Sequence, residues 1–288
     1  MGGGDYALAA FLASPWALAL LRQRPYALRT AALAVCVLTF AIPRGRFVTA
    51  VFAMLMLLKA LQAAAGHEKP RGYLNFVMFL LLPVVVRWDE PMRPDPRRAL
   101  RSVVLGAGQF AMGILITDAA MRMVQADALF VVLFQVGLYL VAAGAFNVLI
   151  APLALRGLDF DDPFDSPLLA RTPGEFWGRR WNTWVSHMLH RYVFLPSGGR
   201  HHPLRGTLAA FAVSGVAHEA VFARVPAGAF GWMLAYFLTQ GALVVATSRW
   251  RAFRVLAKRR PWLSRGITIA VILASGALFV HGAAPIAS

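Results

Sequence analysis

The chain is a succession of long apolar runs separated by shorter polar stretches. Nine runs approach the length needed to cross about 30 Å of hydrocarbon, and they cover residues 6–21, 26–42, 47–65, 73–86, 99–117, 128–155, 204–223, 226–247 and 266–284. Apolar residues make up 59% of the 288-residue chain and charged residues only 15%, whereas a soluble domain is nearer half apolar and a quarter charged. The pattern predicts an all-α, polytopic transmembrane bundle of about eight or nine spans, forming a single membrane-embedded domain over residues 1–288.

The distribution of basic residues predicts how the chain lies in the membrane. A net charge of +16 in a soluble protein would suggest nucleic acid as a partner. Here Lys and Arg gather in alternate loops between the apolar runs, as the positive-inside rule predicts, so we expect no nucleic acid and assign the more basic side to the cytoplasm. The composition is rich in Ala, Arg and Pro, which is typical of a GC-rich genome. It favours the bacterial inner membrane for this multi-pass protein.

One long polar segment, residues 156–205, separates the sixth and seventh runs. Thr172 and Glu175 have the spacing of a capping box, and Pro173 suits the first helical position, so we expect a helix from about Thr172 to Tyr192. One face of this helix would carry its bulky apolar side chains, which are Trp177, Trp181, Trp184 and Met188. Tryptophan on one face and arginine on others is typical of an amphipathic helix that lies in the membrane interface. The segment therefore predicts an interfacial helix ahead of the next span.

Two adjacent ionisable residues, His218 and Glu219, interrupt the apolar run 204–223. Such side chains are costly in hydrocarbon unless they face a protein interior or a wet cavity, which makes them a candidate functional site. An imidazole accepts and returns a proton near neutral pH. Ser214, four residues earlier on the same helical face, is expected to hydrogen-bond a ring nitrogen. Glu219 is expected to pair with an Arg or another buried polar group, and the alternative for both is a non-catalytic interhelical contact.

Other kinds of active site find less support in the sequence. The zinc motif H-E-x-x-H fails because Phe222 stands where the second histidine is required. No G-x-S-x-G nucleophile motif is present, and the single cysteine, Cys36, has no sequence partner. We therefore expect no metal and no cofactor. A direct transfer assisted by a base fits better than a covalent enzyme intermediate.

Asn182 follows Trp181 in the motif FWGRRWN. A neutral amide can donate a hydrogen bond to an ester or thioester carbonyl and stabilise the oxyanion that develops there. The alternative is an asparagine on a helix surface. Four arginines on the predicted cytoplasmic side can hold phosphates, either of a nucleotide-bearing donor or of lipid headgroups, and they are Arg179, Arg180, Arg200 and Arg205.

At these residues the chain resembles the membrane-bound O-acyltransferases, in particular the wax-synthase-like branch. The resemblance covers residues 163–219, through PFDSPLLARTPGEFWGRRWNTWVSHMLHRYVFLP and then FAVSGVAHE. It implies a helical bundle that encloses a tunnel, with acyl-CoA entering from the cytoplasm and a lipophilic alcohol entering within the bilayer. His218 matches the family's catalytic histidine, which deprotonates the acceptor hydroxyl. Asn182 matches the second polar position, which orients or polarises the reacting groups.

The resemblance implies transfer of an acyl group from acyl-CoA to a fatty alcohol, a sterol, or a terpenoid or polyketide hydroxyl. The residues expected to support His218 and Asn182 are Glu219, Ser214, Trp181 and Trp177. One alternative is a proton-coupled transporter or flippase that uses His218 and Glu219 as a relay, although no internal repeat of the transporter kind is visible. Another is a non-catalytic scaffold in the membrane. The small residues of runs 99–117 and 128–155 permit either close helix packing or space for a chain.

Overall fold

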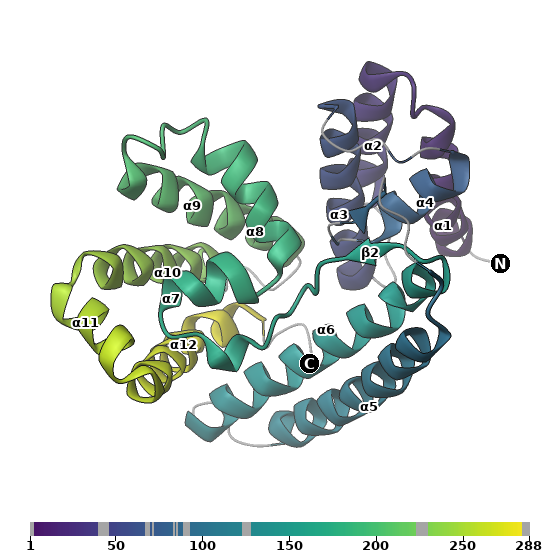
Figure 1. Cartoon of the computed structure of the whole chain (residues 1–288). Coiled ribbons are helices and arrows are strands. Elements are labelled where there is room, and N and C mark those ends of the chain that lie inside the picture. Colours follow the sequence, from purple (N-terminus) through teal and green to yellow (C-terminus); the bar gives the residue numbers. More distant parts are fainter. Residues whose placement is uncertain are drawn as a thin grey trace. The chain divides into compact units, whose positions relative to one another are not determined.

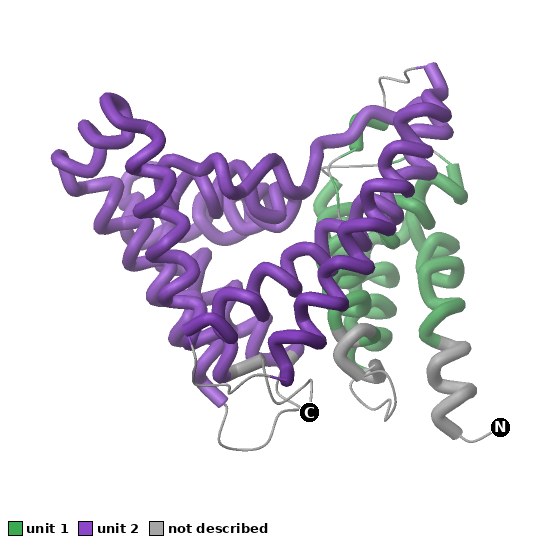
Figure 2. The backbone as a smooth tube through the Cα atoms, turned by 90° about the horizontal axis from the view of Figure 1, so that it is seen from below, with its two compact units in different colours: residues 1–91 green, residues 92–288 purple. Residues whose placement is uncertain are grey.

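The computed structural model describes residues 3–39, 46–66, 70, 72–82, 84, 86–88, 93–122, 128–222 and 230–283. Clustering of the chain gives two compact units, residues 1–91 and residues 92–288 (Figure 2). Both are built almost entirely from helices (Figure 1). Parts of the expected spans lie outside the described residues, namely 40–42, 83, 85, 223, 226–229 and 284. The expectation of one domain over residues 1–288 stays a prediction.

The first unit packs its helices around a core of leucine, methionine and phenylalanine. Its described elements are α1 (Gly3–Leu20), α2 (Pro25–Thr39), α3 (Arg46–Ala64), α4 (Tyr73–Leu81) and the short strand β1 (Val86–Arg87). One charged residue, Lys59, is fully buried in this core. Its ammonium group donates to the carbonyl of Val84 at 2.8 Å and lies 4.4 Å from the centre of the Phe79 ring. These two contacts compensate a charge that would otherwise be costly to bury.

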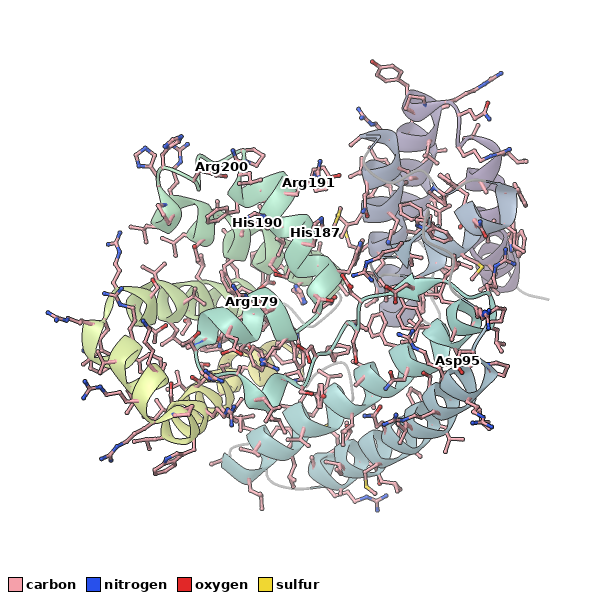
Figure 3. The ribbon with its side chains drawn as sticks, in the orientation of Figure 1. Asp95, Arg179, His187, His190, Arg191 and Arg200 are labelled. Carbon is pink, nitrogen blue, oxygen red and sulfur yellow. The ribbon has the colours of Figure 1, made fainter. Side chains whose placement is uncertain are left out.

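The second unit carries the motifs. Its described elements are α5 (Pro96–Met121), α6 (Ala128–Leu155), β2 (Asp159–Phe160), η1 (Pro167–Leu169), α7 (Pro173–Glu175), η2 (Phe176–Arg180), α8 (Thr183–Leu189), η3 (His190–Phe194), α9 (Pro203–Phe222), α10 (Trp232–Arg249), α11 (Arg251–Arg259) and α12 (Pro261–Ala283). The side chain of Asp95, labelled in Figure 3, starts α5 by accepting a hydrogen bond from the Arg98 N–H, and Pro96 takes the first helical position. Both choices are typical of a helix N-terminus.

Helices α5 and α6 form a hairpin in which glycines bring the two backbones into close contact (Figure 1). A Cβ atom at Gly113 would lie 2.5 Å from the Val141 nitrogen, and one at Gly144 would lie 2.5 Å from the Phe110 nitrogen. Neither position has room for a methyl group without movement of the backbone. At these positions the small residues serve close helix packing, the first of the two readings that the sequence allowed.

Each of the nine apolar runs contains a described helix, namely α1, α2, α3, α4, α5, α6, α9, α10 and α12. Among the described residues, three helices are long and apolar enough to cross a membrane, at Pro96–Met121, Ala128–Leu155 and Pro261–His281. The nine residues of α4 rise only roughly 14 Å, less than half the hydrocarbon thickness. The all-α architecture of an integral membrane protein is confirmed, and the count of eight or nine spans and the tunnel stay predictions.

Candidate active site

Helix α9 carries the histidine, half-buried, one turn after Ser214. The Nδ1 atom of His218 lies 2.8 Å from the backbone carbonyl oxygen of Ser214. A carbonyl oxygen can only accept a hydrogen bond, so Nδ1 carries the proton and a neutral ring has its lone pair on Nε2. The sequence predicted a contact between Ser214 and the ring, and the contact exists. It is made by the carbonyl rather than the hydroxyl.

Glu219 pairs with backbone groups of the neighbouring helix α10. Its carboxylate is buried and accepts the backbone N–H groups of Met233 and Leu234, at 2.8 and 3.1 Å. These groups belong to the first turn of α10, where backbone N–H groups have no partner within the helix and a negative charge is favourable. Of the two partners expected, an arginine or another buried polar group, the structure shows the second, as backbone N–H groups. Glu219 caps α10 and fixes α9 against it.

A cluster of aromatic rings connects His218 to the tryptophans of the motif. We call it the aromatic cluster, and its members are Phe176, Trp177, Trp181, Phe211, Tyr236 and Phe237. The His218 ring lies 4.3 Å from Phe237, measured between ring centroids, and Phe237 lies 6.0 Å from Trp177. Trp177 in turn lies 6.1 Å from Trp181. The structure thus brings together three of the predicted site residues, His218, Trp177 and Trp181, by a chain of ring contacts.

The continuous helix expected from Thr172 to Tyr192 is wrong. Its start is as predicted, because the Thr172 side chain accepts the Glu175 N–H. After the π-helical turn η2, however, Trp181 adopts an extended conformation and forms a short bridge with Phe164. The Trp181 ring packs on Tyr139 of α6 at 5.5 Å between centroids. The Trp181 ring thus faces the protein. This segment is therefore not the surface helix that the periodicity predicted.

Asn182 occupies the break in this helix. Its backbone has a φ of 44°, a left-handed conformation that asparagine tolerates better than most residues. Its side-chain oxygen caps α8 by accepting the Val185 N–H at 3.4 Å. The cap occupies the oxygen of the amide, so the Nδ2 group is the half that can donate to a carbonyl. Asn182 therefore caps α8 and can still donate a hydrogen bond from Nδ2. It is not an asparagine on the surface of a continuous helix, which was the alternative.

The four predicted phosphate-binding arginines separate into two groups. Arg180 is held within its own segment, because its Nε atom donates to Glu175 at 2.8 Å and its Nη1 atom donates to the carbonyl of Asp165 at 3.0 Å. Partial burial opposes ionisation of Glu175, but hydrogen bonds from Arg171 and Arg180 and their charges lower its pKa. This network stabilises the turn before the break. Arg180 therefore does not join the exposed group.

Arg179, Arg200 and Arg205 are exposed, as the phosphate-binding prediction requires. Arg200 lies near α8 and the start of α9 with His187, His190 and Arg191, whereas Arg179 comes from η2 and lies apart from them (Figure 3). Burial and the nearby charges of Arg191 and His190 lower the pKa of His187, against the opposing charge of Asp161. The neutral form of the His187 ring is therefore favoured beside Arg191.

Known proteins are similar to the segment that carries the candidate site. The membrane bound O-acyl transferase family matches residues 161–239, a range that contains every predicted site residue. The Arabidopsis thaliana protein named "Probable long-chain-alcohol O-fatty-acyltransferase 8" is 25% identical over 223 residues, which are 72% of this chain and 63% of that protein. The segment 161–239 is thus similar to the membrane-bound O-acyltransferases, and the relatives named for long-chain-alcohol O-fatty-acyl transfer are similar to a longer part of the chain.

Two shorter similarities are to proteins with related names. "Probable long-chain-alcohol O-fatty-acyltransferase 7" of Arabidopsis thaliana is 36% identical over 120 residues, 38% of this chain and 33% of that protein. "Acyl-CoA–sterol O-acyltransferase 1" of the same plant is 32% identical over 96 residues, 31% of this chain and 28% of that protein. The chain spans less than two thirds of the length of these curated relatives.

The structure adds two residues to the candidate site that the sequence analysis missed, Gln240 and Ser275. Trp177 donates from Nε1 to the Gln240 side-chain oxygen at 3.1 Å, and the Gln240 amide nitrogen donates to the Ser275 hydroxyl at 2.6 Å. Gln240 is fully buried. A glutamine inside the apolar run 226–247 was the available signal, because an amide in such a run requires polar partners.

Among the described residues, no group of three His, Cys, Asp or Glu side chains is arranged to hold a metal ion.

Proposed function

We propose that this protein transfers an acyl group from acyl-CoA to the hydroxyl of a hydrophobic acceptor within the membrane. The observation that carries the proposal is the hydrogen bond from His218 Nδ1 to the Ser214 carbonyl, which leaves the lone pair of a neutral ring on Nε2. This base sits on an apolar helix beside the aromatic cluster, in the segment that matches the family. The names of the relatives support a long-chain alcohol or a sterol as the class of acceptor.

The reaction is an acyl transfer without a covalent enzyme intermediate. Nε2 of His218 takes the proton of the acceptor hydroxyl, and the oxygen attacks the thioester carbonyl carbon. Asn182 Nδ2 donates a hydrogen bond to the carbonyl oxygen as negative charge develops there. The carbon–sulfur bond then breaks, the thiolate of CoA takes the proton back from the imidazolium, and the ester and neutral His218 remain. No cofactor takes part beyond acyl-CoA as co-substrate.

The binding site for the acyl-CoA donor and the type of membrane are proposed from the charged surface and the composition. The exposed Arg179, Arg200 and Arg205 suit the phosphates of CoA because guanidinium groups bind phosphate with two parallel hydrogen bonds. We place this face at the cytoplasm on the positive-inside rule. The bacterial inner membrane is proposed from composition alone, since the relatives named above are plant proteins.

The transporter alternative would use Glu219 as one of its two relay groups. A proton relay through His218 and Glu219 needs the carboxylate to exchange protons with the ring, but that carboxylate accepts two backbone N–H groups of α10. Such a hydrogen-bonded carboxylate acts as a cap. Ester formation by detergent-solubilised protein, where no gradient exists, separates the enzyme from the transporter.

The test supplies labelled acetyl-CoA and palmitoyl-CoA to membranes that contain the protein, together with fatty alcohols, sterols and diacylglycerol. Mass spectrometry then detects new ester. We expect ester from the wild type and its loss in His218→Ala. If the wild type forms no ester and releases no free CoA above the level of His218→Ala, the proposal is contradicted.

A further inference from the structure

Helix α11 (Arg251–Arg259) is a second amphipathic element, which the sequence analysis treated only as a basic loop. It joins α10 to α12 and lies at the outer edge of its unit in Figure 1. Phe253 and Ala257, one turn apart, are buried, and the helix packs on α10 and α12. One face of α11 is therefore anchored to the protein, and the rest of its surface faces outward.

The outward surface of α11 is basic. Arg251, Arg254 and Lys258 follow one another at spacings of three and four residues, so they form one stripe along the helix. Three more exposed basic residues flank the stripe, and they are Arg249, Arg259 and Arg260. Six positive charges thus lie within twelve residues.

These charges have no acidic partner among the residues that the structure describes. No Asp or Glu occurs anywhere from residue 249 to residue 265. Among the residues that the structure describes, none of the six forms an ion pair. Like charges three or four residues apart destabilise an isolated helix. The basic surface of α11 is therefore available to an anionic group from outside the described part of the chain.

Two exposed tryptophans fix the level of α11 relative to the membrane. Trp250 precedes the helix and is 62% exposed, and Trp262 follows it and is 68% exposed. Tryptophan is enriched where a membrane protein meets the headgroup region. Trp262 also lies in the first turn of α12, one of the three helices that can cross a membrane. The basic stripe therefore lies where a span leaves the hydrocarbon, at the depth of lipid phosphates.

We propose that residues 249–262 bind the phosphates of anionic phospholipid headgroups. Juxtamembrane Lys and Arg residues are attracted to anionic lipid, and the attraction adds up over neighbouring charges. The paired tryptophans favour lipid over a soluble phosphate donor, because they place the basic stripe in the headgroup layer. The proposal concerns lipid binding and does not depend on acyl transfer.

The test measures lipid binding to the full-length chain in a neutral detergent. Fluorescent phosphatidylglycerol and fluorescent phosphatidylcholine are titrated against the wild type and against R254Q/K258Q/R259Q. We expect the wild type to prefer phosphatidylglycerol and the triple variant to bind it at least tenfold more weakly. Free coenzyme A is added as a competitor and should not displace the lipid.

A matched control removes the same charge elsewhere. R93Q/R97Q/R101Q neutralises three exposed arginines around the start of α5 and should change binding less than threefold. The charge-preserving R254K/R259K should bind like the wild type, which separates loss of charge from loss of folding. Equal losses in the two triple variants, displacement by coenzyme A, or no preference for the anionic lipid would overturn the proposal.

Discussion

His218 and Asn182, the two residues proposed to act in catalysis, are held by different kinds of local structure. His218 lies within the regular helix α9, and its partner is the carbonyl one turn earlier in the same helix. Asn182 lies where a helix breaks, and its left-handed conformation accompanies a bridge between Trp181 and Phe164 and ring packing against α6. The regular helix fixes a tautomer by local geometry, whereas the break positions an amide through contacts distant in sequence. Changes to the two regions should therefore differ in kind.

The largest effect is expected from the regular helix. His218→Ala removes the proposed general base, which is typically worth 10²–10⁴ in rate, so ester formation should fall by about that factor. The matched control is His281→Ala, because His281 makes the same contact, from Nδ1 to a carbonyl four residues earlier, outside the aromatic cluster. Its rate should stay within about twofold of the wild type. Similar losses in both variants would assign the effect to helix structure rather than to a base.

Substitutions of Asn182, at the break, should lower the rate of ester formation less. They separate the capping role of its oxygen from the donor role of its Nδ2 group. Asn182→Asp keeps an oxygen that can cap α8 and tolerates the left-handed backbone, but it has no Nδ2 donor. We expect an unchanged melting temperature and a rate of ester formation about 10²-fold lower, the usual loss of an oxyanion donor. Asn182→Gly fits the same backbone and lacks the whole amide, so its rate should be equally low. Full activity of Asn182→Asp would reduce Asn182 to a structural role.

A third change tests how the two regions are connected. Gln240→Leu leaves the buried Trp177 N–H without an acceptor and should cost about 1–3 kcal/mol of stability. It should also lower the rate, because Trp177 contacts Phe237, which contacts His218. Gln109→Leu is the control, since it breaks a comparable bond with Asn147, between α5 and α6. Chemical denaturation in detergent and ester formation should show both variants destabilised and only Gln240→Leu slowed.

The smallest effect is expected at the turn before the break. The pKa of Glu175 is lowered from an ordinary value of 4.5. Its carboxylate therefore stabilises the fold above about pH 4.5, and this contribution is lost as the pH falls through its lowered folded-state pKa. Glu175→Gln should cost about 1 kcal/mol near pH 7. Unfolding measured across pH should show the difference from the wild type shrinking in acid, and a constant difference would contradict the assignment to charge.

The two regions also show what the sequence could predict. Helix α9 and the contact of His218 with Ser214 were predictable, because they depend on residues four apart in one apolar run. The break at Trp181 was not, because the capping box and the tryptophan spacing both favour a continuous helix there. What stops that helix is packing against Phe164 and Tyr139, whose positions a local pattern does not contain.

Partners that come from another helix were the other failure. Glu219 was recognised as a buried acid, but its N–H donors at Met233 and Leu234 are backbone groups, which carry no sequence signal. Gln240 did carry a signal, as an amide in an apolar run. A second amphipathic helix, α11, was not predicted, and in it basic residues surround a face formed by Phe253 and Ala257.

The central claim is that the Ser214 carbonyl holds the Nδ1 proton of His218, so that Nε2 is the base. The most direct measurement is nitrogen NMR of protein labelled with ¹⁵N-histidine, with the His218 signals assigned by their loss in His218→Ala. At a pH where the ring is neutral, the account predicts a protonated Nδ1 and an unprotonated Nε2. A spectrum with the proton on Nε2 would contradict the claim, because the ring could not then accept the acceptor's proton at that atom.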